Sequence, residues 1–275
     1  MRDHEFEFLR SFVYERSRIS LDQSKRELVA ARLTKRLRAT GLEAVGDYCR
    51  LLRSPEGEEE RARLIDAIST NHTFFFRESA HFDLVRTRVI PELAAQAQAE
   101  RGGQFNAWSA ACSSGEEAYS LAMTLDESLG GKGWAWRVEA TDISHRMLEA
   151  ASRAIYREGA VEPHTPDWAM RYFEQGFGPQ QGNYRVRPEV RSGVNFRQLN
   201  LLDAAPPFPG PLHLIFCRNV MIYFDRPTQE ELVNKLTQLL VPGGYLMVGH
   251  SEGLTGISHR LKLVQPSVYR RPSVA

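Results

Sequence analysis

The sequence has few of the features that mark secreted, membrane or metal-binding proteins. Its three cysteines, Cys49, Cys112 and Cys217, show neither a Cys-x-x-Cys pair nor a spacing typical of metal ligands. We therefore expect buried thiols, a reducing compartment and no bound metal ion. No apolar run approaches the roughly 20 residues that span a bilayer, and the first residues lack the apolar stretch of a signal peptide. These absences predict a cytoplasmic protein without membrane insertion.

An excess of charge of one sign is absent too. The 275 residues carry a formal net charge of +1, and 42% of them are hydrophobic and 25% charged. This balance gives no overall attraction to nucleic acid or to membranes, so any electrostatic steering is local. The composition and length are typical of a globular protein with one large and one small domain. We also expect a monomer with no nucleic-acid partner.

The segment between residues 105 and 125 is the most informative. Residues 105–111 predict a strand, the small residues around Gly115 predict a tight turn, and Glu116 and Glu117 begin an amphipathic helix. Small residues let a ligand approach the backbone. Two acids at the helix start disfavour pyrophosphate and favour a ligand with an amine or a positive charge, such as S-adenosylmethionine. The alternative interpretation is an ordinary strand-to-helix connection.

A second strand, over residues 136–142, ends in Asp142. In a doubly wound fold, an acid at this point binds the ribose hydroxyls of an adenosine. Alternatively, Asp142 only caps the helix that begins beside Ser144. Together with the preceding turn, Asp142 favours a nucleoside ligand.

Two further strands present polar residues at the edge where open α/β sheets bind ligands. Residues 194–200 lead to Asn200 and Leu201, an amide and an apolar side chain of the kind that frames adenine in methyltransferases. A nearly continuous apolar run, typical of a buried parallel strand, precedes Arg218 and Asn219.

Helical and strand patterns divide the chain into parts. Residues 1–77 show only helical periodicity and predict an all-helical N-terminal domain, whereas strands and helices alternate over residues 105–275, as a parallel sheet requires. We expect residues 78–104 to form a linker that contains a helix. The interval at about 157–193 is too long for a plain connection and predicts an inserted β-subdomain. The alternative interpretation is that this segment only covers the edge of the sheet.

Six segments combine into one pattern: Asn71-x-Thr73-x-x-x-Arg77, Ser113-Ser-Gly-Glu-Glu117, Asp142, Asn200-Leu201, Phe216-Cys-Arg-Asn-Val-Met-Ile-Tyr-Phe224 and Gly249-His-Ser-Glu252. This pattern resembles the chemotaxis receptor methyltransferases of the CheR family, in the same order and over nearly the whole chain. The resemblance implies a Rossmann-like, S-adenosylmethionine-dependent methyltransferase sheet. It also implies methyl transfer to glutamate side chains on chemoreceptor cytoplasmic helices, with glutamate methyl esters and S-adenosylhomocysteine as products. The turn lacks repeated glycines, but a single glycine with flanking serines is the form expected in this family.

The resemblance also implies which residues form the site. The expected cofactor-binding residues are Asn71, Thr73, Arg77, Glu116, Asp142, Asn200, Leu201, Arg218 and Asn219. Tyr223 and Arg218 are the expected catalytic residues, with a core position as the alternative for Tyr223. Arg77 suits the cofactor's carboxylate as a bidentate partner, or else it pairs with Glu78 or Glu117.

The implied reaction needs no Ser-His-Asp, Cys-His or metal constellation, and none is evident in the sequence. A glutamate side chain has a reference pKa near 4.3 and is a carboxylate nucleophile at neutral pH. Alignment and exclusion of water then supply the acceleration. His250 and Glu252 follow the last core strand and either shape the site or are polar loop residues.

Two basic groups are candidates for receptor docking. On the second helix, Arg32, Lys35 and Arg36 either form a solvated face or orient glutamate-rich receptor helices. In the inserted subdomain, Arg185 and Arg187 are expected to help bind a receptor's C-terminal pentapeptide as an added strand, as some family members do.

Two other functions compete with receptor methylation. One is a non-catalytic module that senses the cofactor or tethers to receptors, and the other is a methyltransferase for small molecules or nucleic acid.

Overall fold

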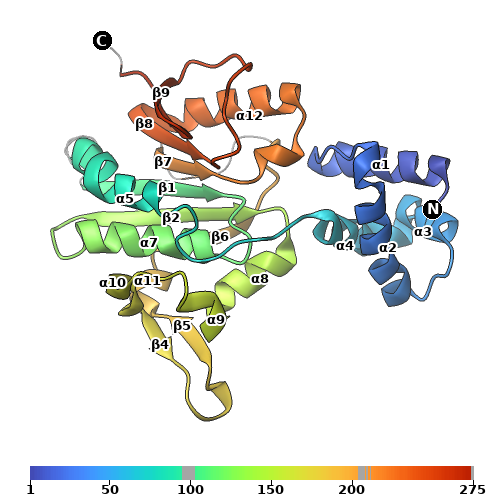
Figure 1. Ribbon diagram of the computed structural model, residues 1–275, viewed down its shortest axis with the longest axis horizontal. Helices are drawn as coiled ribbons and strands as arrows, with labels where there is room; N and C mark the ends of the chain where they lie inside the picture. Colours follow the sequence, from blue (N-terminus) through green and yellow to red (C-terminus); the bar gives the residue numbers. More distant parts are fainter. Residues whose placement is uncertain (95–102, 204–207, 209, 211, 274–275) are drawn as a thin grey trace.

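The computed structural model describes residues 1–94, 103–203, 208, 210 and 212–273. A helical domain lies beside one end of a larger α/β domain, and an extended segment near residue 70 joins the two (Figure 1). Among the described residues, no helix is both long and apolar enough to cross a membrane.

The N-terminal domain is all-helical, as predicted. It consists of α1 (Asp3–Ser17), α2 (Arg26–Thr40), α3 (Val45–Arg53) and α4 (Glu58–Ile68), with short 3-10 turns η1 (Gln23–Lys25) and η2 (Pro55–Gly57). Helix α2 ends at Thr40, because Gly41 takes a left-handed φ of 71°. Apolar residues one helical turn apart, among them Phe6, Leu9 and Val13 of α1, form the core of this domain.

The larger domain is built on a sheet of seven strands in the order β6-β2-β1-β7-β8-β10-β9. The strands are β1 (Gln104–Ala110), β2 (Ala135–Asp142), β6 (Val194–Gln198), β7 (Leu212–Cys217), β8 (Leu240–Val248), β9 (Lys262–Gln265) and β10 (Val268–Arg270). Neighbours from β6 to β8 run parallel, whereas β10 and β9 add an antiparallel edge that the alternating sequence pattern does not predict. The predicted α/β class with a Rossmann-like sheet is confirmed.

Helices cover both faces of this sheet, and the side chains of β7 alternate between them. Leu214 and Phe216 belong to the core shared with α5 (Ala80–Leu84), the π-helical turn η3 (Val85–Val89) and α7 (Glu116–Leu129). Ile215 and Cys217 belong to the core shared with α12 (Arg226–Leu239). Successive side chains of a strand point to opposite faces of the sheet, so this alternation between two cores is expected of a strand that is buried on both faces.

Residues 80–94 belong to the larger domain. Phe82, Val85, Val89 and Leu93 are buried in the same core as the sheet. The sequence assigns residues 78–104 to a linker that contains a helix, and in the structure this helical part covers one face of the sheet. Residues 95–102 of the predicted linker lie outside the described residues.

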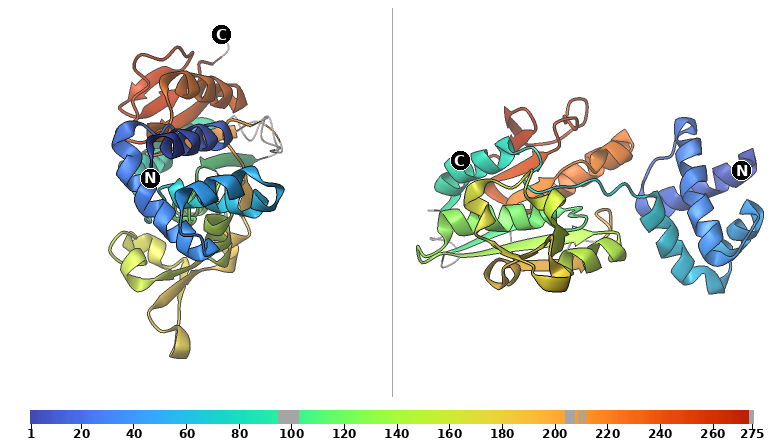
Figure 2. Two further views of the ribbon diagram at one scale, coloured as in Figure 1. Left: turned by 90° about the vertical axis from the view of Figure 1, so that its right-hand side faces the viewer. Right: turned by 60° about the horizontal axis from the view of Figure 1, so that its bottom comes forward.

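The predicted inserted subdomain forms a three-stranded antiparallel sheet in the order β3-β5-β4. Its elements are β3 (Ile155–Arg157), α9 (Glu158–Val161), α10 (Asp167–Met170), β4 (Phe173–Gln175), the 3-10 turn η4 (Gly178–Gln180), β5 (Asn183–Val186) and α11 (Pro188–Arg191). It follows α8 (His145–Arg153), and its β4–β5 hairpin projects away from the body of the domain (Figures 1 and 2). The ring of Phe173 lies 5.2 Å from that of Phe75, which anchors the subdomain on the segment between the domains.

Candidate functional site

A cavity lies where the two domains meet, at the carboxyl ends of β1, β2 and β7. Ser17 and Ile19 line it from the N-terminal domain, which the sequence pattern does not predict. Among the predicted cofactor-binding and catalytic residues, the following line this cavity: Asn71, Thr73, Arg77, Asp142, Asn200, Leu201, Arg218, Asn219 and Tyr223. The structure therefore brings together residues that are up to 152 positions apart in the chain, from Asn71 to Tyr223.

The turn after β1 has the tight backbone that its small residues predict. Ala111, Ser113 and Gly115 have left-handed φ angles of 71°, 50° and 96°. A Cβ on Gly115 would lie 2.8 Å from the Cβ of Ala151, so glycine is required for α7 to begin this close to α8. The turn thereby brings its backbone to the edge of the cavity.

The carboxylate of Asp142 forms hydrogen bonds with the turn after β1 and with the start of α8. One carboxylate oxygen accepts the N–H of Ser113 at 2.8 Å, and the other accepts the N–H of Ser144 at 2.9 Å, at the start of α8. Burial raises the pKa of Asp142, although these two N–H groups favour the ionised form. Asp142 thus ties the turn to α8 and also lines the cavity.

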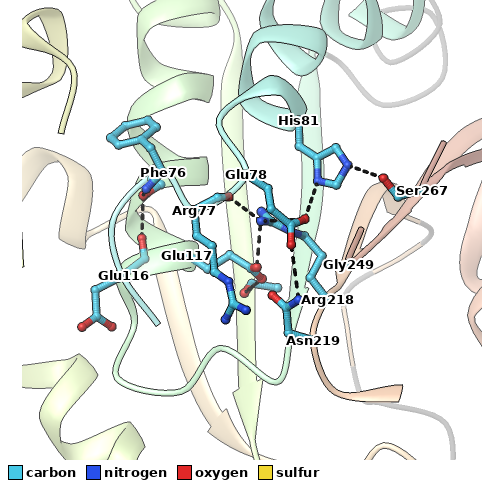
Figure 3. Close-up of polar contacts among 12 residues, drawn as sticks. Phe76, Arg77, Glu78, His81, Glu116, Glu117, Arg218, Asn219, Gly249 and Ser267 are labelled. Atoms are coloured by element: carbon cyan, nitrogen blue, oxygen red, sulfur yellow. Dashed lines mark hydrogen bonds and ion pairs between the residues drawn. The ribbon is translucent and has the colours of Figure 1, made fainter. Parts of the chain in front are cut away.

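A charged cluster surrounds Arg218, whose side chain is fully buried (Figure 3). Its Nη2 lies 3.2 Å from Oε2 of Glu78, and its Nη1 lies 3.6 Å from Oε2 of Glu117. Although burial opposes ionisation of Glu78, the Arg218 charge and the side-chain amide of Asn219 hold the pKa of this carboxyl below its ordinary value. Burial raises the pKa of Glu117, despite the same arginine. Sequence reasoning missed Glu78 and Glu117 as partners of Arg218, because no local spacing connects them.

Asn71, Thr73 and Arg77 lie on the extended segment between the domains. Arg77 donates from Nη1 to the carbonyl of His72 at 2.7 Å. The alternative ion pairs of Arg77 with the neighbouring glutamates do not form in this structure, since Arg218 occupies that position. The Arg77 side chain instead lines the cavity, where the prediction of a cofactor contact places it.

Of the two glutamates at the start of α7, only Glu117 lines the cavity, and a cofactor contact of Glu116 stays a prediction. The Glu116 carboxylate accepts the hydroxyl of Ser114 at 2.7 Å, and it is not among the residues that line the cavity. Glu117 lines the cavity instead and accepts the hydroxyl of Ser109 at 2.7 Å. Successive helical residues point in directions about 100° apart, so only one of two adjacent glutamates faces the cavity.

Backbone strain concentrates around this cavity. Eight non-glycine residues among those described have a left-handed φ. Five of them lie in the turn after β1, at the end of β7 or in the segment between the domains: Phe76, Glu78, Ala111, Ser113 and Asn219. Packing that maintains such conformations is typical of functional sites.

The N-terminal domain contacts two residues that line the cavity. The side-chain amide of Asn200 donates to the carbonyl of Arg16 at 3.0 Å. The carbonyl of Tyr223 accepts the N–H of Ser20 at 2.7 Å. The position of the helical domain is therefore coupled to the geometry of the cavity.

The predicted docking residues of α2 differ in their surroundings. Lys35 is exposed, and Arg32 donates to the carbonyl of Ala67 at 3.2 Å. Arg36 forms a two-point ion pair with the buried Glu60, at 2.8 and 2.6 Å. Arg36 is expected to offer its charge to a substrate, and its pair with Glu60 already neutralises part of that charge.

Arg185 and Arg187 lie on and just after β5, and both are exposed. Strand β5 is the central strand of the small sheet, so its backbone is paired on both sides. A peptide strand can therefore add only at β3 or β4. Arg185 is in register with Glu174 of β4 and Ile155 of β3.

Two residues of the cavity lining, Ser113 and Arg218, have buried polar atoms that lack a hydrogen-bond partner within the described part of the chain: Oγ of Ser113, and Nε and Nη1 of Arg218. Buried polar atoms of this kind need a partner. S-adenosylmethionine carries a carboxylate and ribose hydroxyls that supply acceptors for both, so the residues fit this cofactor.

Glu78, His81 and His250 place potential metal-ligand atoms within 4.8 Å of one another. Oε2 of Glu78, however, already faces the Arg218 guanidinium at 3.2 Å. A metal cation there meets like-charge repulsion, so this group does not fit a metal site.

The sheet order, the acid at the end of β2 and the cavity at the strand ends define the class of S-adenosylmethionine-dependent methyltransferases. Two family descriptions match the chain, "CheR methyltransferase, SAM binding domain" over residues 71–270 and "CheR methyltransferase, all-alpha domain" over residues 4–69. The chain belongs to the CheR methyltransferase family, which confirms the resemblance and the cofactor S-adenosylmethionine.

Several relatives carry the name chemotaxis protein methyltransferase. The one from Klebsiella aerogenes is 44% identical, covering 98% of this chain and 90% of the relative. The one from Escherichia coli K12 is 42% identical, covering 98% and 91%. Chemotaxis protein methyltransferase 2 of Pseudomonas aeruginosa is 40% identical, covering 96% and 92%. The chain is thus similar to these enzymes over both of its domains.

Proposed function

We propose that this methyltransferase modifies glutamate side chains on the cytoplasmic helices of a chemoreceptor, forming glutamate methyl esters and S-adenosylhomocysteine. The observation that carries the proposal is the cavity between the domains, which combines the predicted cofactor residues with side chains of the helical domain. The relatives named chemotaxis protein methyltransferase support the same assignment.

The positions of the chain's residues in the cavity support the following proposed roles. S-adenosylmethionine, when bound, supplies an electrophilic methyl group. Asp142 and Asn200 hold the nucleoside, while Arg77 and Arg218 hold the amino-acid end. The receptor glutamate is ionised at neutral pH, so no residue of the chain needs to remove a proton. Tyr223 orients the reacting groups, and Ser17 and Ile19 help exclude water, so that positioning supplies the acceleration.

A groove between α2, α4 and α8 is the proposed docking site for the receptor helix. It is lined by Arg32, Lys35, Arg36, Glu59, Ala62, Arg63, Asp66, Ala67, His145, Arg146 and Glu149. Positive side chains outnumber negative ones, which suits a helix rich in glutamates. Asp66 of the groove also lines a neighbouring pocket together with Ile143, which lines the cavity, so the groove ends close to the cavity.

The inserted subdomain is the proposed site for a receptor's C-terminal pentapeptide. Strand β4 is an edge strand of the small sheet, and the projecting hairpin carries the exposed Phe177. An added strand there gains backbone hydrogen bonds, and Arg185 attracts acidic side chains. Binding at this place raises the local concentration of receptor helices without changing the chemistry. We further propose that the enzyme acts as a cytoplasmic monomer.

A transfer assay with methyl-labelled cofactor and a panel of receptor cytoplasmic fragments tests the function. The proposal predicts label on one or more fragments and no label on matched fragments whose methylatable glutamates are changed to glutamine. Cofactor binding without transfer to any fragment would support the non-catalytic sensing or tethering module instead.

A further inference from the structure

Residues 219–223, here called the pocket loop, connect the end of β7 to the region before α12. Asn219, Val220 and Tyr223 of this loop line the cavity. The loop has no regular structure beyond the 3-10 turn η5 (Met221–Tyr223), and Asn219 has a left-handed φ of 58°. Its conformation must therefore be fixed by contacts from outside the loop.

The carboxylate of Glu252 supplies these contacts. Its Oε2 accepts the N–H of Asn219 at 2.5 Å and the N–H of Gly249 at 2.7 Å, and its Oε1 accepts the N–H of Ile222 at 3.2 Å. The residue is 6% exposed and is not among those that line the cavity. One buried side chain thus joins both ends of the pocket loop to the segment that follows β8.

The close approach of the segment after β8 to Glu252 and the pocket loop depends on glycine at position 249. A Cβ on Gly249 would lie 2.6 Å from Oε2 of Glu252 and 2.5 Å from Nδ2 of Asn219. Real Cβ atoms essentially never approach non-bonded atoms this closely, so the segment after β8, the pocket loop and Glu252 are packed as one unit. This accounts physically for the Gly-His-Ser-Glu segment, whose role the sequence leaves open.

We infer that Glu252 is a positioning residue for methyl transfer, because its carboxylate holds the pocket loop in the shape that presents Asn219 and Tyr223 to the reacting groups. The inference rests on the proposed function. Glu252 touches neither cofactor nor substrate, and its effect passes through the backbone of the loop.

The chemistry of the contact requires a carboxylate. Three N–H donors converge on the two oxygens, which in the ionised form only accept hydrogen bonds. A glutamine at position 252 has the same shape, but its NH₂ group would face at least one backbone N–H. Glu252→Gln therefore disturbs the loop without creating a cavity in the packing.

A side chain of α12 also holds the pocket loop through hydrogen bonds, as Glu252 does. Nε2 of Gln229 donates to the carbonyls of Met221 at 2.9 Å and Phe224 at 3.0 Å. Gln229→Met removes both of these hydrogen bonds. Because position 229 is a partly exposed position of a helix, the variant is expected to fold. Glu230→Gln is the matched control, because Glu230 also accepts a backbone N–H, that of Ser258 at 2.9 Å, but lies outside the cavity lining.

The experiment compares steady-state methyl transfer to a receptor fragment with calorimetric binding of S-adenosylhomocysteine, using the full chain. In Glu252→Gln, kcat should fall about 10- to 100-fold, since a displacement of about 1 Å in a reacting geometry has effects of this size. The affinity for S-adenosylhomocysteine should change by less than about threefold, because most predicted cofactor residues lie outside the loop. Gln229→Met should lower kcat in the same direction by a smaller factor, and Glu230→Gln should match the wild type.

Amide proton resonances give a readout that general destabilisation would not mimic. In ¹⁵N-labelled wild type, the amides of Asn219 and Gly249 should appear downfield, because they donate short bonds to a charged oxygen. Both should move upfield in Glu252→Gln, while the amide of Ser113, held by Asp142, should stay in place.

Each outcome is decisive. A kcat within threefold of wild type in both Glu252→Gln and Gln229→Met would overturn the inference, as would an equal loss in Glu230→Gln. If Glu252→Gln does not fold, the kcat of Gln229→Met decides alone. A wild type that transfers no methyl group refutes the proposed function instead, and the amide shifts then still report whether Glu252 holds the loop.

Discussion

Replacing Arg218 by methionine should strongly destabilise the larger domain. The change keeps an unbranched apolar stem but removes the guanidinium group, and it leaves Glu78 and Glu117 facing each other without their cation. The Arg218 side chain is fully buried, and removing one partner of a buried ion pair costs about 3–5 kcal/mol. For a chain of this size, each kcal/mol shifts the unfolding midpoint by about 2–4 °C, so the midpoint should fall by about 6–20 °C.

Thermal unfolding followed by circular dichroism, without cofactor, measures this effect. Arg50→Met is the matched control, because Arg50 pairs with Asp47 on the surface with 73% of its side chain exposed. Exposed pairs of this kind contribute about 0–1 kcal/mol. If Arg218→Met lowered the midpoint no more than Arg50→Met does, the reasoning about the buried cluster would be refuted.

The pH dependence follows from the lowered pKa of Glu78. A carboxyl whose pKa is lower in the folded state contributes stability above its unfolded pKa, and this contribution is lost as the pH falls through the folded value. The difference in unfolding free energy between wild type and Arg218→Met should therefore be largest near neutral pH. It should shrink below about pH 4.3, the ordinary pKa of glutamate, as the carboxylates become protonated. A difference that stays constant as the pH falls from neutral to well below about 4.3 would contradict the proposed pairing.

Three other changes have defined outcomes. Asp142→Asn should weaken S-adenosylhomocysteine binding by about 1–3 kcal/mol, and unchanged affinity in calorimetry would remove Asp142 from the cofactor site. Lys35→Glu combined with Arg146→Glu should slow receptor methylation, most strongly at low salt, while cofactor binding stays intact; equal rates at low salt would show that the groove is only a solvated surface. Arg185→Ala should weaken binding of an acidic and aromatic receptor tail peptide measured by fluorescence anisotropy, and no binding to wild type at high micromolar peptide would mean that no tether exists.

Local patterns were enough to predict much of the fold. Helical periodicity and the glycine at position 41 define the helices of the N-terminal domain, and apolar runs with polar ends define the parallel strands. Asp142, Asn200 and Arg218 could be assigned to one site because the carboxyl ends of parallel strands meet at one edge of a sheet.

Contacts between distant residues could not be predicted from such patterns. Arg218 pairs with Glu78, which lies 140 positions earlier in the chain, and Arg36 pairs with Glu60 of another helix. Both ion pairs depend on how elements pack, which hydrophobic periodicity does not specify. The choice between Glu116 and Glu117 likewise depends on the rotation of α7 about its axis. Strands β9 and β10 have only four and three residues, too few for a period to be visible.

The most direct test of the account is the chemical identity of the transferred methyl group. A receptor fragment labelled by this enzyme from methyl-labelled S-adenosylmethionine should release its label as volatile methanol in mild alkali, because a glutamate methyl ester is hydrolysed there. The release should match the total label, and mass spectrometry should place the methyl group on glutamate. Label that survives alkali, or transfer to lysine or arginine nitrogen, would contradict the account.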